Sequence, residues 1–189
     1  MKNARFLKNR KLIVSIIFLL IGAGTFAQVN FSGTWTMNEA KSKFGGEGGG
    51  PGGGPGGPMG PATMTVAQDA NILTSDQTMR GRDGEEIKMS MKYNLDGKES
   101  ENTFFMDAKR KSTLIWSADK KSITINSSMI FDRDGESREM KESETWTLSD
   151  DGKTLFIEST RPMGPGAPGG QDGQTPREPM KMTMAYDKK

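Results

Sequence analysis

Apolar and polar side chains alternate along the chain from residue 62 to residue 160, a stretch that contains no proline. Side chains two positions apart lie on the same side of a β-strand, so each alternating run predicts a strand with one buried and one solvated face. Antiparallel sheets allow such faces, whereas fully covered parallel sheets do not. The pattern is clearest in residues 86–95, where the apolar set is Ile87, Met89, Met91, Tyr93 and Leu95.

These runs predict about ten strands, and no ten-residue window has a helical period. Asp-Gly dipeptides at 83–84, 96–97, 134–135 and 151–152 favour tight hairpins between them. A meander of this length must close or protect its two edges, and closure is the simpler solution. The predicted fold is therefore all-β, a single antiparallel up-and-down β-barrel of about 8–10 strands. The expected strands are 29–37, 62–69, 71–80, 86–95, 101–106, 110–117, 122–131, 139–148, 154–160 and 180–186.

Two segments rich in glycine and proline flank the alternating region. Residues 45–61 hold eleven Gly and four Pro, and residues 161–179 hold five of each. Together they contain every proline of the chain, which fits the exclusion of proline from central strands. Such a composition buries too little apolar area to offset the entropy lost on ordering, so both segments are expected to be flexible loops.

Residues 1–27 have the organisation of a cleavable signal peptide. A basic region is followed by an apolar run from Leu12 to Ile21 and by small residues that end at Ala27. About ten apolar residues span roughly half of a bilayer core, which argues against a retained transmembrane anchor. Residues 28–189 would then form one domain in the periplasm or outside the cell. The chain has no cysteine, so neither a lipoprotein anchor nor a disulfide is expected, and no membrane insertion is expected after cleavage.

The net charge of the chain depends on this cleavage. Removal of residues 1–27 takes away five of the 26 basic residues and none of the 24 acidic ones, which leaves a charge of about −3. The pI of 8.8 therefore belongs to the uncleaved chain. Nucleic acid is not an expected partner.

Two segments carry a resemblance to a known family. Residues 30–44, which contain Gly33-Thr34-Trp35, resemble the opening strand of bacterial lipocalin-like proteins of the cell envelope, whose signature there is Gly-x-Trp. Residues 144–155 (ETWTLSDDGKTL) look like the penultimate hairpin of that group. The spacing of the predicted strands resembles that of the family over most of the chain after residue 28.

The resemblance implies structural roles for Gly33 and Trp35. In the family, the tryptophan packs across the closed end of the barrel, often under an arginine from a late strand. Here the last strand carries Lys181 and Lys188 instead of that arginine, which points to the looser calycin-like barrel. The family also implies a small apolar ligand in the barrel, although many members have no known ligand.

The absence of His and Cys excludes most hydrolytic mechanisms and ordinary zinc sites. Glu142 and Glu144 share one side of a strand, but two solvated acids beside Lys141 are the favoured interpretation. The acidic Gly-containing segments 132–136 and 150–152 lack the ligand spacing of a calcium loop and favour hairpin turns. No enzymatic activity, metal or cofactor is therefore expected.

Methionine is frequent, with 14 in the chain and Met-x-Met patterns at 89/91 and 180/182/184. Soft thioethers bind Cu(I), but both sets lie on the apolar side of a strand, which favours core packing or cavity lining. The leading hypothesis is a non-enzymatic binding protein with a small apolar ligand inside the barrel. Alternatives are an envelope protein–protein interaction module and Met-based copper binding. The expected lining residues are Met89, Met91, Tyr93, Phe105, Trp116, Met182, Met184 and Tyr186.

Overall fold

A computed structural model describes residues 28–44, 60–80, 84–104, 108–133, 136–161 and 179–189. Several predicted features lie outside these residues: the signal peptide 1–27, nearly all of both Gly/Pro-rich segments, the Asp134-Gly135 turn and Phe105. The described chain contains strands and turns but no helix. The all-β prediction is confirmed.

The strands are β1 (Gly33–Met37), β2 (Lys43–Phe44), β3 (Thr63–Gln68), β4 (Ile72–Arg80), β5 (Glu86–Asn94), β6 (Ser100–Thr103), β7 (Lys109–Trp116), β8 (Ser122–Arg133), β9 (Glu136–Leu148), β10 (Thr154–Arg161) and β11 (Met180–Lys188). Ten of these eleven strands correspond to the predicted ones, and the two-residue strand β2 was not predicted. Strands β8 and β9 are longer than the alternation indicated, and β1 begins at Gly33 rather than at residue 29.

All strands belong to one antiparallel sheet with the order β5-β4-β3-β1-β11-β10-β9-β8-β7-β6, and β2 pairs with β11. Neighbours in the sheet are consecutive in the chain with two exceptions: β1 pairs with β3, because β2 leaves the path, and the first strand meets the last one. There Trp35 of β1 faces Lys188 of β11 in the register. The pairing of the two ends bends the meander into a nearly closed up-and-down barrel.

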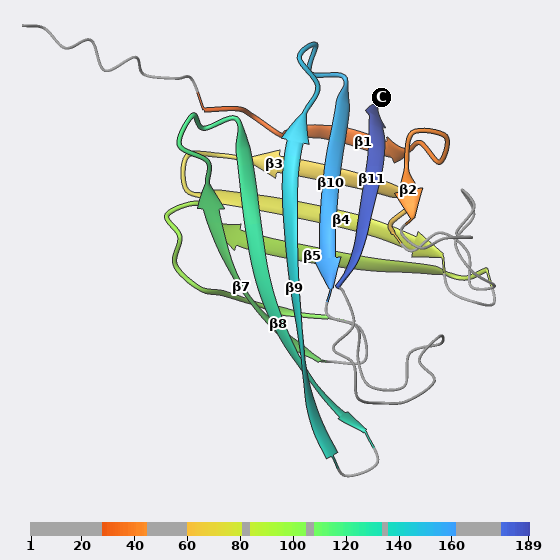
Figure 1. Cartoon of the computed structure of the whole chain (residues 1–189), viewed down its shortest axis with the longest axis vertical. Coiled ribbons are helices and arrows are strands. Elements are labelled where there is room, and N and C mark those ends of the chain that lie inside the picture. The colour runs from red at the N-terminus through yellow and green to blue at the C-terminus, as the bar shows by residue number, and fades with distance from the viewer. Residues whose placement is uncertain (1–27, 45–59, 81–83, 105–107, 134–135, 162–178) are drawn as a thin grey trace, which may run out of the picture.

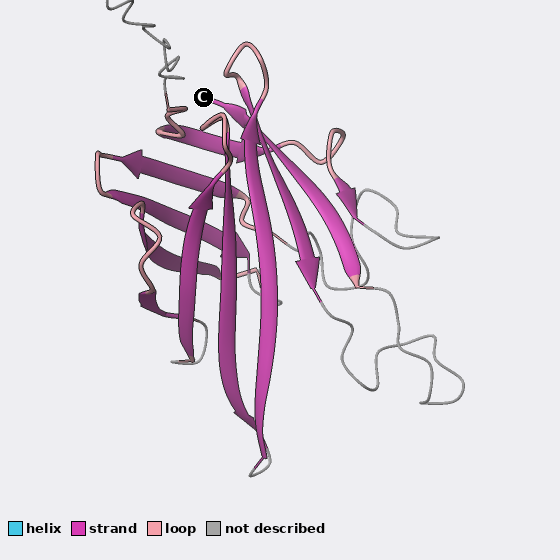
Figure 2. Ribbon diagram, turned by 60° about the vertical axis from the view of Figure 1, so that its left-hand side comes forward, coloured by secondary structure: helices cyan, strands magenta, loops and turns pink. Residues whose placement is uncertain are grey.

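The barrel has two walls whose strands run across each other (Figure 1). One wall is formed by β1, β3, β4 and β5, and the other by β7–β11. The β8–β9 hairpin continues beyond the body of the barrel, as a view from another side also shows (Figure 2). The inner sides of the two walls enclose the core.

The barrel is incompletely closed between β5 and β6. These strands are consecutive in the chain, yet they share no backbone ladder. The side-chain amide of Asn102 on β6 bridges the gap: it accepts a hydrogen bond from the Lys92 N–H (2.8 Å) and donates one to the Lys92 carbonyl (3.0 Å). The Asp96-Gly97 turn connects β5 and β6, and Gly97 has a φ of +82°, but the prediction of a laddered hairpin there is wrong. A side chain takes the place of a strand partner at this seam.

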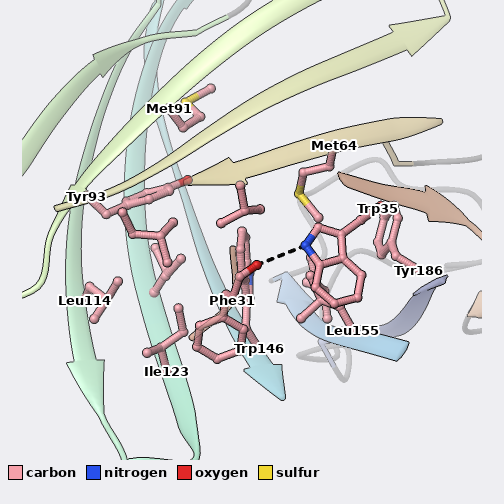
Figure 3. Packing of buried hydrophobic residues seen from close by; sticks show 14 of the residues in the cluster. Phe31, Trp35, Met64, Met91, Tyr93, Leu114, Ile123, Trp146, Leu155 and Tyr186 are labelled. Carbon is pink, nitrogen blue, oxygen red and sulfur yellow. Dashed lines mark hydrogen bonds between the residues drawn. The ribbon is translucent and has the colours of Figure 1, made fainter. Parts of the chain in front are cut away.

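The core follows the predicted alternation. Met91 and Tyr93 of β5 are buried, whereas Lys92 between them is exposed. At one end the core is aromatic: Phe31 contacts Trp146 edge to face, with ring centroids 6.1 Å apart (Figure 3). Phe31 also stacks against Trp116, with ring centroids 6.2 Å apart. This single cluster of buried apolar side chains draws on both walls of the barrel.

Candidate ligand site in the barrel interior

Trp35 occupies the aromatic end of the interior. Its side chain is fully buried, and its indole N–H donates a hydrogen bond to the carbonyl of Phe31 at 3.0 Å (Figure 3). The polar edge of the ring is thereby satisfied inside an apolar environment, as buried tryptophan requires. Trp35 therefore has a structural role in this end of the barrel.

Lys188 covers Trp35 from the last strand. Its ammonium lies 5.2 Å from the centroid of the Trp35 ring, within the range of a cation–π contact. The Lys188 side chain also crosses Gly33, where an added Cβ would lie 2.8 Å from its Cε atom. Gly33 has a φ of +154°, which side chains disfavour. Both Gly33 and Trp35 of the Gly-x-Trp pattern therefore lie next to the Lys188 side chain.

Methionines gather in the interior. Ten of the 14 lie in the described residues, and each of these ten is buried or partly buried. Met91, Met182 and Met184 are among the most buried, and the hydroxyl of Tyr186 lies 3.7 Å from the Met184 sulfur. Flexible, polarizable thioethers adapt to irregular shapes, so this part of the interior can repack around a guest molecule.

A polar part of the interior adjoins the methionines, since Ser159 and Arg161 of β10 face Met182 and Met180 of β11 in the register. Glu142 of β9 is 4% exposed. Its carboxylate accepts hydrogen bonds from the Ser159 hydroxyl (2.9 Å) and from Nε of Arg161 (2.5 Å), both on β10. A buried carboxylate is stable only when its charge and its lone pairs are matched in this way. Glu142 is therefore the centre of a buried polar cluster.

Arg110 joins this cluster from β7. Its side chain is 6% exposed, and Nη2 lies 3.5 Å from Glu142 and 3.6 Å from Glu144. The guanidinium carbon also lies 5.5 Å from the centroid of the Phe104 ring. Burial alone would lower the pKa of Arg110, but the neighbouring acidic groups, Glu144 foremost, raise it above its usual value. The four charged groups, two arginines and two glutamates, balance when both acids are ionised.

The position of the two glutamates corrects the sequence interpretation. Glu142 and Glu144 were expected to be solvated acids beside Lys141, but both point inward, and only Lys141 is exposed. Burial raises the pKa of Glu144, with a further contribution from Glu142, against the opposing charge of Arg110. The indole N–H of Trp146 donates to Glu144 at 3.4 Å. The alternation showed that Glu142 and Glu144 lie on the same side of β9, but it did not show that this side is the buried one.

Two serines complete the polar part. The hydroxyls of Ser112 on β7 and Ser127 on β8 are hydrogen-bonded to each other at 2.9 Å and are buried. Sequence reasoning did not select Arg110, Ser112, Ser127, Ser159 or Arg161. The alternation did indicate that Arg110 and Ser112 point inward, because they lie on the same side of β7 as Leu114 and Trp116. These polar residues were not selected because only apolar side chains were expected to line the interior.

The predicted lining residues lie in or against the buried apolar cluster of the barrel. Met91, Tyr93, Met182, Met184 and Tyr186 are buried members of it, and Met89 and Trp116 are partly buried and pack against it. Burial raises the pKa of both tyrosines. Phe105 lies outside the described residues. The structure therefore brings seven of the eight together in one enclosed core.

A polar hollow of about 640 Å³ lies along β7–β10. Most of its lining residues alternate with the inward ones and so belong to the outer face of the barrel. Thr113, Asn126, Ser143 and Thr160 form one row across four strands. Ion pairs of Lys111 with Glu99 (3.1 Å) and of Lys141 with Glu139 (3.3 Å) border it. Ser112, Ser127 and Glu142 of the buried polar cluster also line this hollow, so it adjoins the cluster.

Comparison with known proteins assigns no family to the chain. No family model matches the sequence, and neither a curated protein nor a solved structure is significantly similar to it. Within the described part of the chain, no helix has the length and apolar character needed to cross a bilayer. Only the geometry of the barrel therefore indicates a function.

Proposed function

We propose that this protein is an exported, lipocalin-like binding protein that holds a small, mainly apolar molecule in the interior of its barrel. The observation that carries the proposal is the composition of the interior, where methionine side chains lie next to a polar cluster of two arginines and two glutamates. Ligand sites in proteins combine a mostly apolar lining with a few placed polar groups, and the interior of a β-barrel is a common position for them.

The polar cluster supports binding because stability alone does not account for it. A buried ion pair generally contributes little net stability, and apolar residues of similar volume are often equally good or better. The charged side chains of the cluster come from β7, β9 and β10, so they meet only when the barrel has folded. A recognition role accounts for charges placed where packing would favour apolar side chains.

The lipocalin-like part of the proposal is supported by Trp35. It is buried at one end of the barrel, and a cation from the last strand lies over its ring, as the resemblance implies for an arginine. Lys188 supplies the cation in this chain. The signal-like segment 1–27 supports export, which secretion of the full-length chain with amino-terminal sequencing of the product would test.

The interaction-module alternative has weaker support. Among the described residues, the exposed large apolar side chains are Ile115 (56%) and Ile130 (57%). Ile115 faces Thr124 in the register, six positions from Ile130 along β8 and therefore roughly 20 Å away. The two side chains do not form one apolar patch. Copper binding through thioethers stays a prediction that a Cu(I) titration against a competing chelator would test.

Binding of N-phenyl-1-naphthylamine, a neutral apolar dye whose fluorescence rises in apolar surroundings, tests the proposal. Met89→Trp places a large ring on the inner side of β5, whereas Ser90→Trp places the same ring on the outer side one position later. We expect Met89→Trp to weaken dye binding about tenfold or more, because it fills apolar volume that the ligand needs. Ser90→Trp should leave binding unchanged.

Native mass spectrometry of protein purified from its own source provides an independent measurement. A retained small molecule that organic solvent extracts would support the proposal. Absence of both a retained molecule and dye uptake, or equal dye affinity in the two tryptophan variants, would reject binding inside the barrel. Circular dichroism of each variant establishes that the strands are intact.

A further inference from the structure

Among the described residues, Nε of Arg110 is a hydrogen-bond donor without a partner. Its Nε atom is completely buried and makes no hydrogen bond among the described residues, although Nη2 faces two carboxylates. An unsatisfied buried donor costs free energy, and the cost is larger for a charged group. Arg110 points inward, because it alternates with the exposed residues Lys109 and Lys111. The barrel therefore presents an unused donor to its interior.

The surroundings of Arg110 fix which side of the guanidinium is open to a guest. Phe104 covers one face of the group, and Glu142 and Glu144 occupy the Nη2 end. In the register, Arg110 faces Met129 on β8, which in turn faces Met140 on β9. Methionine side chains have three rotatable bonds and rearrange easily. These two residues can make room for a ligand atom beside Nε.

We infer that Nε of Arg110 binds a neutral hydrogen-bond acceptor, the carbonyl oxygen of a ketone, ester or amide, on the apolar ligand of the barrel. This inference rests on the proposed function and specifies the ligand class. The acceptor completes the hydrogen bonds of the guanidinium, and the apolar remainder of the molecule lies against the methionines.

Charge decides between a neutral acceptor and a carboxylate. Two glutamates already surround the guanidinium, and Nη2 of Arg110 lies within 3.6 Å of an oxygen of each of them. A carboxylate on Nε would place a third negative charge beside these two in a medium of low dielectric constant, where like charges repel strongly. A carbonyl oxygen accepts the same hydrogen bond without adding charge.

The test compares 2-nonanone, nonane and nonanoate, which differ in the polar end. Each competes with N-phenyl-1-naphthylamine, and binding to the wild type is compared with binding to Arg110→Lys, which keeps the positive charge but lacks Nε. We expect the substitution to weaken 2-nonanone about tenfold, the value of one hydrogen bond to a charged donor, and to leave nonane unchanged. Lys111→Arg is the control, because Lys111 is exposed on the outer side of β7, next to Arg110 in the chain, and pairs with Glu99. It should not discriminate between the ketone and the alkane.

A second measurement uses the unmodified protein. The ¹⁵Nε–¹H resonance of Arg110 should shift when 2-nonanone binds and should stay in place when nonane binds. If both ligands bind and neither affects this resonance, or if nonanoate binds more tightly than 2-nonanone at pH 7.5, the inference is overturned while the proposed function stands. If none of the compounds and no dye binds, the proposed function itself fails.

Discussion

Asn102 on β6 bonds to both backbone groups of Lys92 on β5, with its amide oxygen 2.8 Å from the Lys92 nitrogen and its amide nitrogen 3.0 Å from the Lys92 oxygen. The side-chain amide has one donor and one acceptor in the arrangement of a peptide group, so it substitutes for a strand partner. It is 8% exposed, and it joins the two edges of the sheet. This pair accounts for how a sheet with two edges behaves as a nearly closed barrel.

Replacement of Asn102 should open the seam. Asn102→Ala removes both hydrogen bonds and leaves the Lys92 backbone without these partners, so we expect the free energy of unfolding to fall by about 1–3 kcal/mol. Hydrogen exchange of the Lys92 amide should accelerate more than that of amides in β10. Asn94→Ala is the control, because Asn94 makes one exposed hydrogen bond to the Glu99 carbonyl. Unchanged exchange at Lys92 would show that the seam is held by other contacts.

Gly33→Ala should destabilise the barrel by about 1–3 kcal/mol, because its φ of +154° is accessible almost only to glycine. The new Cβ would also meet Cε of Lys188 at 2.8 Å. Urea denaturation of Gly33→Ala, Lys188→Ala and the double variant separates the two causes. We expect the double variant to recover little of the loss, because the end of the exposed Lys188 side chain can move away from the new Cβ, whereas the backbone strain remains. A double variant as stable as Lys188→Ala alone would show that the contact, and not the backbone, causes the loss.

The raised pKa of Glu144 makes stability depend on pH. Burial is the main cause, and a group whose pKa is raised in the folded state stabilises fully below its ordinary value of 4.5. That contribution is lost as the pH rises through the raised pKa, at up to about 1.4 kcal/mol per pH unit. Glu144→Gln keeps an oxygen for the Trp146 indole and removes the titration. We therefore expect Glu144→Gln to gain stability relative to the wild type as the pH rises from 4.5.

Chemical denaturation of both proteins across pH 4–8 measures this difference. Exposed acids such as Asp151 and Asp187, whose pKa values are lowered by hydrogen bonds, give the opposite trend, but they are common to the two proteins and cancel in the comparison. A constant difference across the range would mean that Glu144 does not titrate differently in the folded state.

Glu142 should be the acid on which stability depends most. Glu142→Ala leaves Arg110 and Arg161 without their shared carboxylate, and removal of one partner from a buried pair costs about 3–5 kcal/mol. Glu139→Ala, three positions earlier on the same strand, removes an exposed acid and should change little. Thermal unfolding followed by circular dichroism compares the two variants. Equal melting temperatures would contradict the buried assignment of Glu142.

The sequence by itself determined the strands and the two sides of most of them. Alternation is a local property, and a strand exposes every second side chain to the same environment, so Met91 and Tyr93 were predicted inward from their spacing alone. The short strand β2 and the absent ladder between β5 and β6 were not predictable in this way. Their pairing depends on the path of the chain and not on local composition.

The tertiary structure decided which polar residues are buried. Arg110 lies 32 positions from Glu142 in the chain, and Glu142 lies 19 positions from Arg161, yet the three side chains meet because β7, β9 and β10 curve around one interior. A charged residue in an alternating run looks the same whether its side faces water or faces an opposite charge across the barrel. Only closure of the sheet, by β1 against β11 and by Asn102 against Lys92, distinguishes the two cases.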